Sequence, residues 1–258
     1  MASTIAHSTR RQDGKVPQSE DDFVTGFLIG SFLSIDIISC ASTRSSPVLE
    51  LDHKFLLERA GIDLEALTGC RNWAMIFIFE ISLLDKWKKE AEKAYKLSFV
   101  ELTKRGGQIA AHLREKLADI DNNTSGIVPA SASSEITKIF GLSAMTYLYV
   151  VISGAYPELP EIMESVSKTI DAFQSLTDPK LLRDLVWPFC ISGCLALEGQ
   201  QAIFRDLLTT AEITQSTVGT CFEAFNIMEE CWKARKTCLS NCDWVSAMDK
   251  RGHYVLLG

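Results

Sequence analysis

Apolar residues recur at intervals of three and four along most of the chain, a spacing that places them on one side of an α-helix. The clearest stripe runs over residues 95–120, where it consists of Tyr95, Phe99, Leu102, Gly106, Ile109, Leu113, Leu117 and Ile120. This segment is predicted to be one long amphipathic helix. Its weak point is Gly106–Gly107, because each glycine costs about 1 kcal/mol relative to alanine in a helix.

The same spacing predicts helices before and after this segment. An early helix starts at residue 21, carries Leu28, Phe32, Ile35 and Ile38, and ends at the polar run 42–47. Others are expected at 48–60, 63–68, 70–94, 136–152, 161–176, 179–196, 199–210, 218–236 and 240–251. Pro188 should kink the helix that contains it, and 121–133 reads as a loop. No long segment alternates with period two, so the predicted fold class is all-α.

Residues 1–20 are polar and mixed in charge, and we expect a disordered tail there. Residues 21–258 are then one multi-helix domain, since a chain of this length can bury a large core. The side chains expected at the centre of that core are large and mostly aromatic: Trp73, Phe77, Phe99, Leu113, Tyr147, Leu148, Trp187 and Phe189.

Charge and apolar content narrow the possible partners. The net charge is −7, so the overall field repels nucleic acid. Asp36 and Glu80 interrupt the apolar stretches 23–39 and 74–84, and no membrane span is therefore expected. The start of the chain is polar and basic and lacks a secretory segment. The eight cysteines then indicate reduced thiols in an intracellular compartment.

Residue types that carry catalysis are not grouped in the sequence. The four histidines (His7, His53, His112 and His253) are far apart, and no nucleophile, metalloprotease or phosphate-loop motif is present. Glu80 stands out because its neighbours are apolar; it is expected at a seam between helices, paired with Arg or Lys. The sequence assigns no catalytic or cofactor-binding residue, and no enzyme activity is expected.

Two cysteine pairs have a spacing that zinc can use, Cys190–Cys194 and Cys238–Cys242, the second with Cys231 upstream. The first pair lies in an apolar run typical of core packing, and the second in a polar region, but neither setting favours a closed site. No metal is expected. Two basic groups could meet phosphate, and both are more typical of solvated surface: Arg10, Arg11 and Lys15 in the tail, and Lys86, Lys88, Lys89, Lys93 and Lys96 among acidic residues.

Five stretches in order resemble the fungal-specific transcription factor domain, the helical region downstream of binuclear zinc-cluster DNA-binding domains. They are IDIISCASTRSSP (35–47), GIDLEALTGCRNWAMIFIFEISLLDKWK (61–88), SAMTYLYVVISGAYPELPEI (143–162), LLRDLVWPFCISGCLA (181–196) and IMEECWKARK with DWVSAMDKRGHYVLL (227–257). The likeness covers roughly residues 25–257 and is nearest to the acriflavine-sensitivity-type regulators. It implies an all-helical regulatory domain and transcriptional control in the nucleus.

The zinc cluster of that family is absent from this sequence. The cluster needs six cysteines that open with Cys-x2-Cys, a spacing found nowhere in the chain. No DNA-binding residue can therefore be carried over, and the chain is expected to bind DNA without sequence specificity, if at all. Either it is a truncated gene product, or it is a regulator that acts through a partner.

The leading hypothesis is a transcription-regulatory domain that works by protein–protein contact, with an effector pocket among its helices. The resemblance suggests control of a metabolic or secondary-metabolite gene cluster. Its partner would be a DNA-binding transcription factor or a second copy of the chain. The alternatives are a small-molecule binder or enzyme built on the same helical scaffold, and a non-functional remnant.

Overall fold

The computed structural model describes residues 20–124, 131–215, 219–237 and 241–258; the predicted tail lies outside these ranges apart from its last residue. Within them the chain forms eleven α-helices and two 3-10 helices and has no strand, which confirms the all-α prediction. In chain order they are α1 (Glu20–Thr43), α2 (His53–Glu58), α3 (Glu65–Thr68), α4 (Asn72–Lys93), α5 (Phe99–Thr124), α6 (Ala132–Ser153), α7 (Pro160–Gln174), η1 (Pro179–Asp184), α8 (Val186–Cys194), η2 (Glu198–Gln200), α9 (Gln201–Thr210), α10 (Cys221–Lys236) and α11 (Trp244–Arg251).

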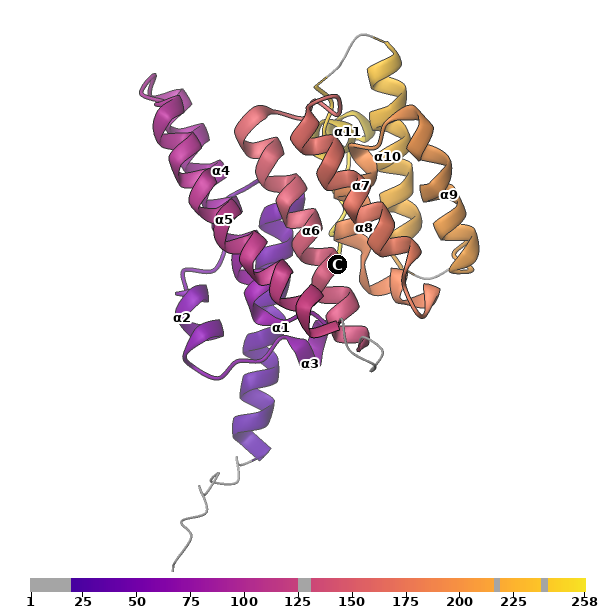
Figure 1. Ribbon diagram of the computed structural model, residues 1–258. Helices are drawn as coiled ribbons and strands as arrows, with labels where there is room; N and C mark the ends of the chain where they lie inside the picture. Colours follow the sequence, from indigo (N-terminus) through magenta and orange to yellow (C-terminus); the bar gives the residue numbers. More distant parts are fainter. Residues whose placement is uncertain (1–19, 125–130, 216–218, 238–240) are drawn as a thin grey trace, which may run out of the picture.

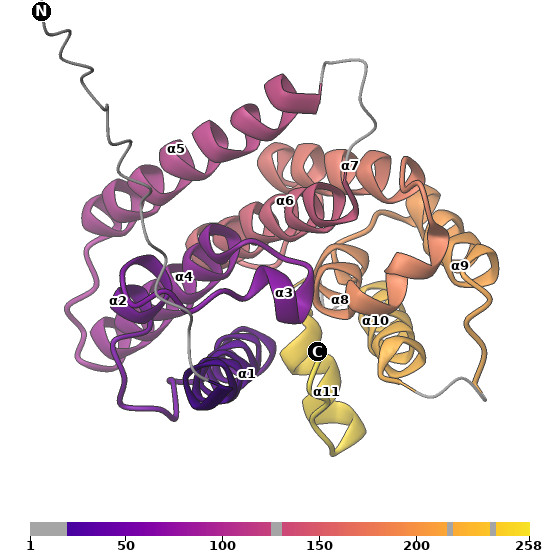
Figure 2. The same cartoon turned by 90° about the horizontal axis from the view of Figure 1, so that it is seen from below.

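Helix α6 is the centre of the fold. It packs against α4 and α5 on one side and against α7 and α8 on the other, and Figure 2 shows it between these two groups. Every residue from 139 to 148 is buried, as expected of a helix that is surrounded on all sides. Its hydroxyls pair within the core: Ser143 lies 3.0 Å from Ser192, and Thr146 lies 2.8 Å from Ser165.

Local sequence sets the ends of α6. The Ser131 hydroxyl accepts a hydrogen bond from the backbone N–H of Ser134 and so caps the first turn. At the other end, Gly154 has φ of +90° and stops the helix. Asp52 and Asp243 cap α2 and α11 in the same way as Ser131, each through a side-chain oxygen that accepts a backbone N–H.

Several predicted segments have different boundaries in the structure. The segment 48–60 forms only the short α2, and the 95–120 helix begins at Phe99, because the chain turns at Tyr95, whose φ is +55°. The predicted helix 179–196 is two pieces, η1 and α8, joined at Leu185. Pro188 therefore falls in the first turn of α8, where proline breaks no hydrogen bond, and the predicted kink is wrong.

Six of the eight predicted core residues are buried, and two are not. Trp73 is only partly buried beside the core. Phe99 is 72% exposed, because it opens α5 before that helix reaches its neighbours. Tyr95, which precedes α5, is exposed as well, whereas Leu102, Leu113 and Ile120 farther along the stripe are buried. Gly106 lies directly against Ile152 of α6 and leaves no room for a Cβ, whereas Gly107 faces open space.

Two helices are long and apolar enough to cross a membrane by length and composition, Val24–Thr43 of α1 and Ala132–Ser153 of α6. Asp36 was expected to make the first apolar run too short to span a membrane, and by length and composition this expectation is wrong. One or two such helices are weak evidence, since a core helix passes the same test. In α6, 78% of the most apolar 18-residue stretch is buried within the protein, and in α1 the buried share of the corresponding stretch is 39%.

Candidate functional site

Glu80 lies where the sequence places it, between two helices. Its Oε1 atom is 2.6 Å from the Nζ of Lys54, so the carboxylate of α4 pairs with a lysine of α2.

Two lysines of the lysine-rich part of α4 contact neighbouring segments. Lys88 donates to the carbonyl of Val151, and Lys89 contacts Asp85 and the carbonyl of Arg44. Arg10, Arg11 and Lys15 lie outside the described residues.

The described cysteines whose spacing zinc could use are buried thiols. Cys190 and Cys194 lie in α8 with no exposed surface, and Cys231 and Cys242 are buried as well. Burial raises the pKa of the Cys194 and Cys231 thiols well above the ordinary value, which keeps them protonated. Cys238 lies outside the described residues. Among those described, no group of three or more Cys, His, Asp or Glu side chains is arranged to hold a metal.

The five stretches that carry the family resemblance meet in one polar and aromatic cluster. The Arg44 guanidinium, just after α1, binds Asp85 of α4 at 2.6 Å and Asp243 at the start of α11 at 2.7 Å. Tyr147 of α6 packs edge-on against Trp187 and Trp244, with ring centres 6.0 and 5.7 Å apart. Asp85 and both tryptophans are almost wholly buried. This cluster therefore holds distant segments of the chain together.

A second buried pair fixes the C-terminal half of α1. The Nε2 atom of His53 lies 2.9 Å from Asp36 Oδ2, and its other ring nitrogen contacts the carbonyl of Leu51. The Asp36 carboxylate also accepts the backbone N–H groups of Val48 and Leu49. Asp36, the charge that interrupts the apolar run, thus ties α1 to the loop that follows it and to α2.

The N-terminal half of α1 is different, because it leaves large apolar side chains exposed. Val24, Phe27, Leu28, Phe32 and Ile35 are each 49% to 59% exposed, and we call them the α1 face. Figure 1 shows this part of α1 extending below the other helices. The segment 23–35 contains no charged residue. The stripe noticed in the sequence is thus real, but three of its four residues face outward and only Ile38 is buried.

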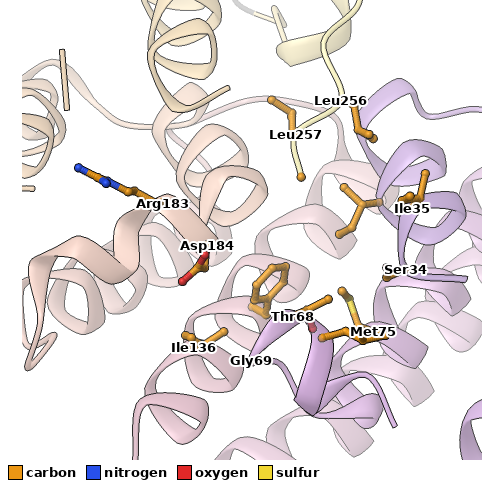
Figure 3. Close-up of a pocket in the computed structure, with 14 residues that line it drawn as sticks. Ser34, Ile35, Thr68, Gly69, Met75, Ile136, Arg183, Asp184, Leu256 and Leu257 are labelled. Atoms are coloured by element: carbon orange, nitrogen blue, oxygen red, sulfur yellow. The ribbon is translucent and has the colours of Figure 1, made fainter. Parts of the chain in front are cut away.

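An apolar cavity of about 380 Å³ adjoins the α1 face, and we call it the α1 pocket. Figure 3 shows its walls, which come from distant parts of the chain. They comprise Ser34, Ile35 and Ile38 of α1, residues 67–69, Met75 of α4, Ile136 and Phe140 of α6, Arg183 and Asp184 of η1, and residues 256–258. An effector pocket among the helices was predicted, but no residue was assigned to it, since no local pattern marks its walls.

Asp184 is the acidic side chain of the pocket wall. Partial burial, the larger effect, raises the pKa of its carboxyl group, and the nearby charge of Arg183 opposes this shift. In Figure 3 the Arg183 side chain points away from the cavity, and Asp184 lies nearer to it. The walls are largely apolar with a few polar groups, a composition typical of ligand-binding sites.

Comparison with known proteins identifies relatives over most of the chain. A trichothecene biosynthesis transcription regulator from Trichoderma arundinaceum is 39% identical over 205 residues, which cover 78% of this chain and 46% of that protein. A regulator of the same description from Fusarium sporotrichioides is 35% identical over 233 residues, 90% of this chain and 54% of the relative. The ustiloxin B cluster transcription factor of Aspergillus flavus is 30% identical over 242 residues, 86% and 40% respectively.

The chain spans about half the length of these curated relatives. No solved structure matches it. The family model of the fungal specific transcription factor domain matches residues 3–258, nearly the whole chain. This match confirms the resemblance seen in the five stretches. The chain belongs to the family of the fungal specific transcription factor domain.

Proposed function

We propose that this chain is a regulatory domain that controls transcription of a secondary-metabolite gene cluster in the nucleus, and that it acts by protein–protein contact. The relatives described above are transcription regulators, two of trichothecene biosynthesis and one of the ustiloxin B cluster. The observation in the structure that carries the contact is the α1 face. Exposed apolar patches of this kind mark interaction surfaces, because their burial against a partner removes apolar area from water.

The occupant that we propose for the α1 face is the same face of a second copy of the chain. The face carries no charge between residues 23 and 35, so its apolar side chains can meet those of a second copy without burying a charged group of this segment. Figure 1 shows that the projecting half of α1 extends below the other helices. Two-fold pairs of identical surfaces are the commonest assemblies. The other partner expected from the sequence, a DNA-binding transcription factor, is an outcome that the experiment below separates.

The first measurement is the molar mass of the purified chain in solution, by light scattering over a range of concentrations. The wild type should approach twice the chain mass, and Phe32→Glu should be a monomer, because pairing would bury a charge in the apolar contact. Val100→Glu is the matched control, since Val100 is 81% exposed on α5, away from α1. A wild type that remains a monomer at all concentrations rejects the second copy as the occupant.

The second measurement tests regulation itself. The gene is deleted in the source fungus, and transcripts of the neighbouring biosynthetic genes are measured after complementation. Wild type and Val100→Glu should restore the transcripts, and Phe32→Glu should not. If deletion changes no cluster transcript, the chain is not a regulator. If Phe32→Glu is inactive although the wild type is a monomer, the face binds a different protein, such as a DNA-binding factor.

The α1 pocket favours one other candidate function, a small-molecule binder built on the same scaffold. Its volume is at the lower end of the range that ligand sites occupy, about 300–1,000 Å³. A binder with no role in transcription would bind its ligand and leave cluster transcripts unchanged on deletion. The two candidates are therefore separated by the transcript measurement.

A further inference from the structure

We infer that the α1 pocket binds a small, uncharged and largely apolar molecule that presents a hydrogen-bond donor, such as a hydroxyl or amine N–H, to the pocket wall. This deepens the proposed function, because it names the chemical class of an effector. Only the regulatory meaning rests on that function. The binding itself is measured on the purified chain and does not depend on transcription.

The apolar character of the ligand follows from the walls. Ile38, Met75, Ile136 and Phe140 are buried core residues whose surfaces also border the cavity, and Leu256 and Leu257 close it from the C-terminal segment. Water in such a space meets few polar partners. A ligand that displaces this water gains about 25 cal/mol for each Å² of apolar surface removed from solvent.

The backbone at Gly69 shapes one wall of the pocket. Gly69 has φ of +69°, which side chains rarely tolerate, and a Cβ there would come 2.7 Å from Ile136 Cδ1. The turn between α3 and α4 can therefore lie directly against α6 only with glycine at this position. The two elements that border the cavity are thus fixed relative to each other, which favours a preformed site over a chance gap between mobile segments.

The preference for a hydrogen-bond donor in the ligand follows from the two hydroxyl groups on the walls, which are left as acceptors. The Ser34 hydroxyl donates its proton to the carbonyl of Ser31, at 2.9 Å. The Thr68 hydroxyl donates to the carbonyl of Leu64, also at 2.9 Å. Each proton is already used within a helical turn. The Thr68 oxygen also accepts the backbone N–H of Cys70, at 3.2 Å, so it keeps one lone pair for the cavity, and the Ser34 oxygen likewise offers lone pairs and no proton.

Asp184 strengthens this preference for a donor. Its carboxylate lies at the exposed rim of the pocket and has no hydrogen bond or ion pair to another described residue. Desolvation raises its pKa, and the nearby charge of Arg183 opposes this shift only in part. Figure 3 shows the one cationic side chain of the wall, Arg183, directed away from the cavity. An anionic ligand would be repelled by the Asp184 carboxylate, whereas a neutral donor could hydrogen-bond to it.

The probe for the first experiment is N-phenyl-1-naphthylamine, an uncharged fluorophore with a single N–H donor. Its fluorescence should rise to saturation at one site per chain. Leu256→Trp places a larger side chain in the pocket. Because this side chain takes up space that the probe needs, the affinity for the probe should fall about tenfold or more. Leu256 is 43% exposed, so this substitution should leave folding intact. If the variant nevertheless fails to fold, Ser34→Leu fills the same space from α1.

Two control variants separate the pocket from other apolar surfaces. Met163→Trp makes a similar enlargement at a 40% exposed residue of α7, outside the pocket, and should bind as the wild type does. Phe32→Glu alters the α1 face and should also retain binding. Absence of saturable binding, or equal affinity in both pocket-filling variants and the wild type, would overturn the inference. So would a loss of binding in Phe32→Glu alone, since the probe would then lie on the α1 face.

Competition by two molecules of equal chain length tests the preferred head group. We expect 1-decanol to displace the probe at about tenfold lower concentration than decanoate, because a hydrogen bond to a charged acceptor is favourable and two adjacent carboxylates repel. Asp184→Asn should reduce this difference by weakening 1-decanol and strengthening decanoate. Stronger competition by decanoate against the wild type would show that Arg183, not Asp184, selects the ligand, and would reject the proposed class.

Discussion

Helices α1 and α6 have similar length and apolar composition but opposite surroundings. Both are long and apolar enough to cross a membrane, yet 78% of the most apolar stretch of α6 is buried in the protein and only 39% of that of α1. In α6 apolar residues cover the whole circumference, and four helices pack around them. In α1 the buried side is the one that carries Leu33, Ile37 and Ala41, and the opposite side faces out. Apolar composition alone therefore does not distinguish a core helix from an interaction surface.

The largest effect should come from removing a side chain that packs on α6. Trp187 is fully buried and lies against Phe140 and Tyr147. Trp187→Ala should lower the free energy of unfolding by about 3–5 kcal/mol, through lost burial and the cavity left behind. Phe32→Ala on α1 should change it by less than about 0.5 kcal/mol. Urea unfolding followed by circular dichroism measures both. Equal effects would show that α1 is as tightly packed as α6.

The next effect concerns the ion pairs that hold the end of α1. Burial raises the pKa of the Asp85 carboxyl, but Arg44 and Lys89 outweigh this, and the net pKa lies below the ordinary value. Asp85 then binds its proton less tightly in the folded state than in the unfolded state. Its contribution to stability is complete above the unfolded pKa of about 4 and is lost as the pH falls through the lower folded value.

Asp85→Asn should therefore cost about 3 kcal/mol at neutral pH, because it leaves Arg44 buried with one partner fewer. It should also flatten the loss of stability that the wild type shows below about pH 4, since the titrating group is gone. Urea unfolding of both proteins at several pH values tests this. If the two curves remained parallel down to acid pH, the Asp85 carboxylate would not be the group that links α1 to α4.

The smallest effects should distinguish two adjacent glycines of α5, one facing α6 and the other solvent. Gly106→Ala places a Cβ against Ile152 of α6 and should destabilise the protein by about 1–3 kcal/mol through overpacking. Gly107→Ala meets nothing and should stabilise it by about 1 kcal/mol, because alanine favours the helix. Thermal melting of the two variants gives the signs. Stabilisation by both would mean that α5 and α6 do not cross closely.

These two glycines also show how far sequence analysis reaches. Their place on a long helix was predicted from the spacing of apolar residues, and both were expected to weaken it. The structure shows that Gly106 is needed for the close approach of α6 and that Gly107 is not. Phe99 was expected in the core because it shares the stripe, but it lies beyond the end of the neighbouring helix and is 72% exposed. Periodicity predicts which side of a helix is apolar, and it carries no information on how far along that side a neighbour extends.

The candidate site was less accessible to sequence analysis than the fold. Glu80 was expected to pair with a basic residue across two helices, and Lys54 is that residue. The α1 pocket was foreseen only as a kind of site, because its walls combine residues near 34, 68, 136, 183 and 256. No spacing rule connects positions so far apart. The α1 face was visible as an apolar stripe, but its exposure depends on where other helices end.

The sequence by itself determined that the chain is helical and that five stretches mark one family. These features depend on neighbours within a few residues, since helix formation and capping are local. Only the tertiary structure decided that Arg44, Asp85 and Asp243 meet, that Gly69 lies against Ile136, and that one side of α1 has no neighbour. Those outcomes depend on how whole helices pack, because contacts between distant segments are set by the shapes of both surfaces.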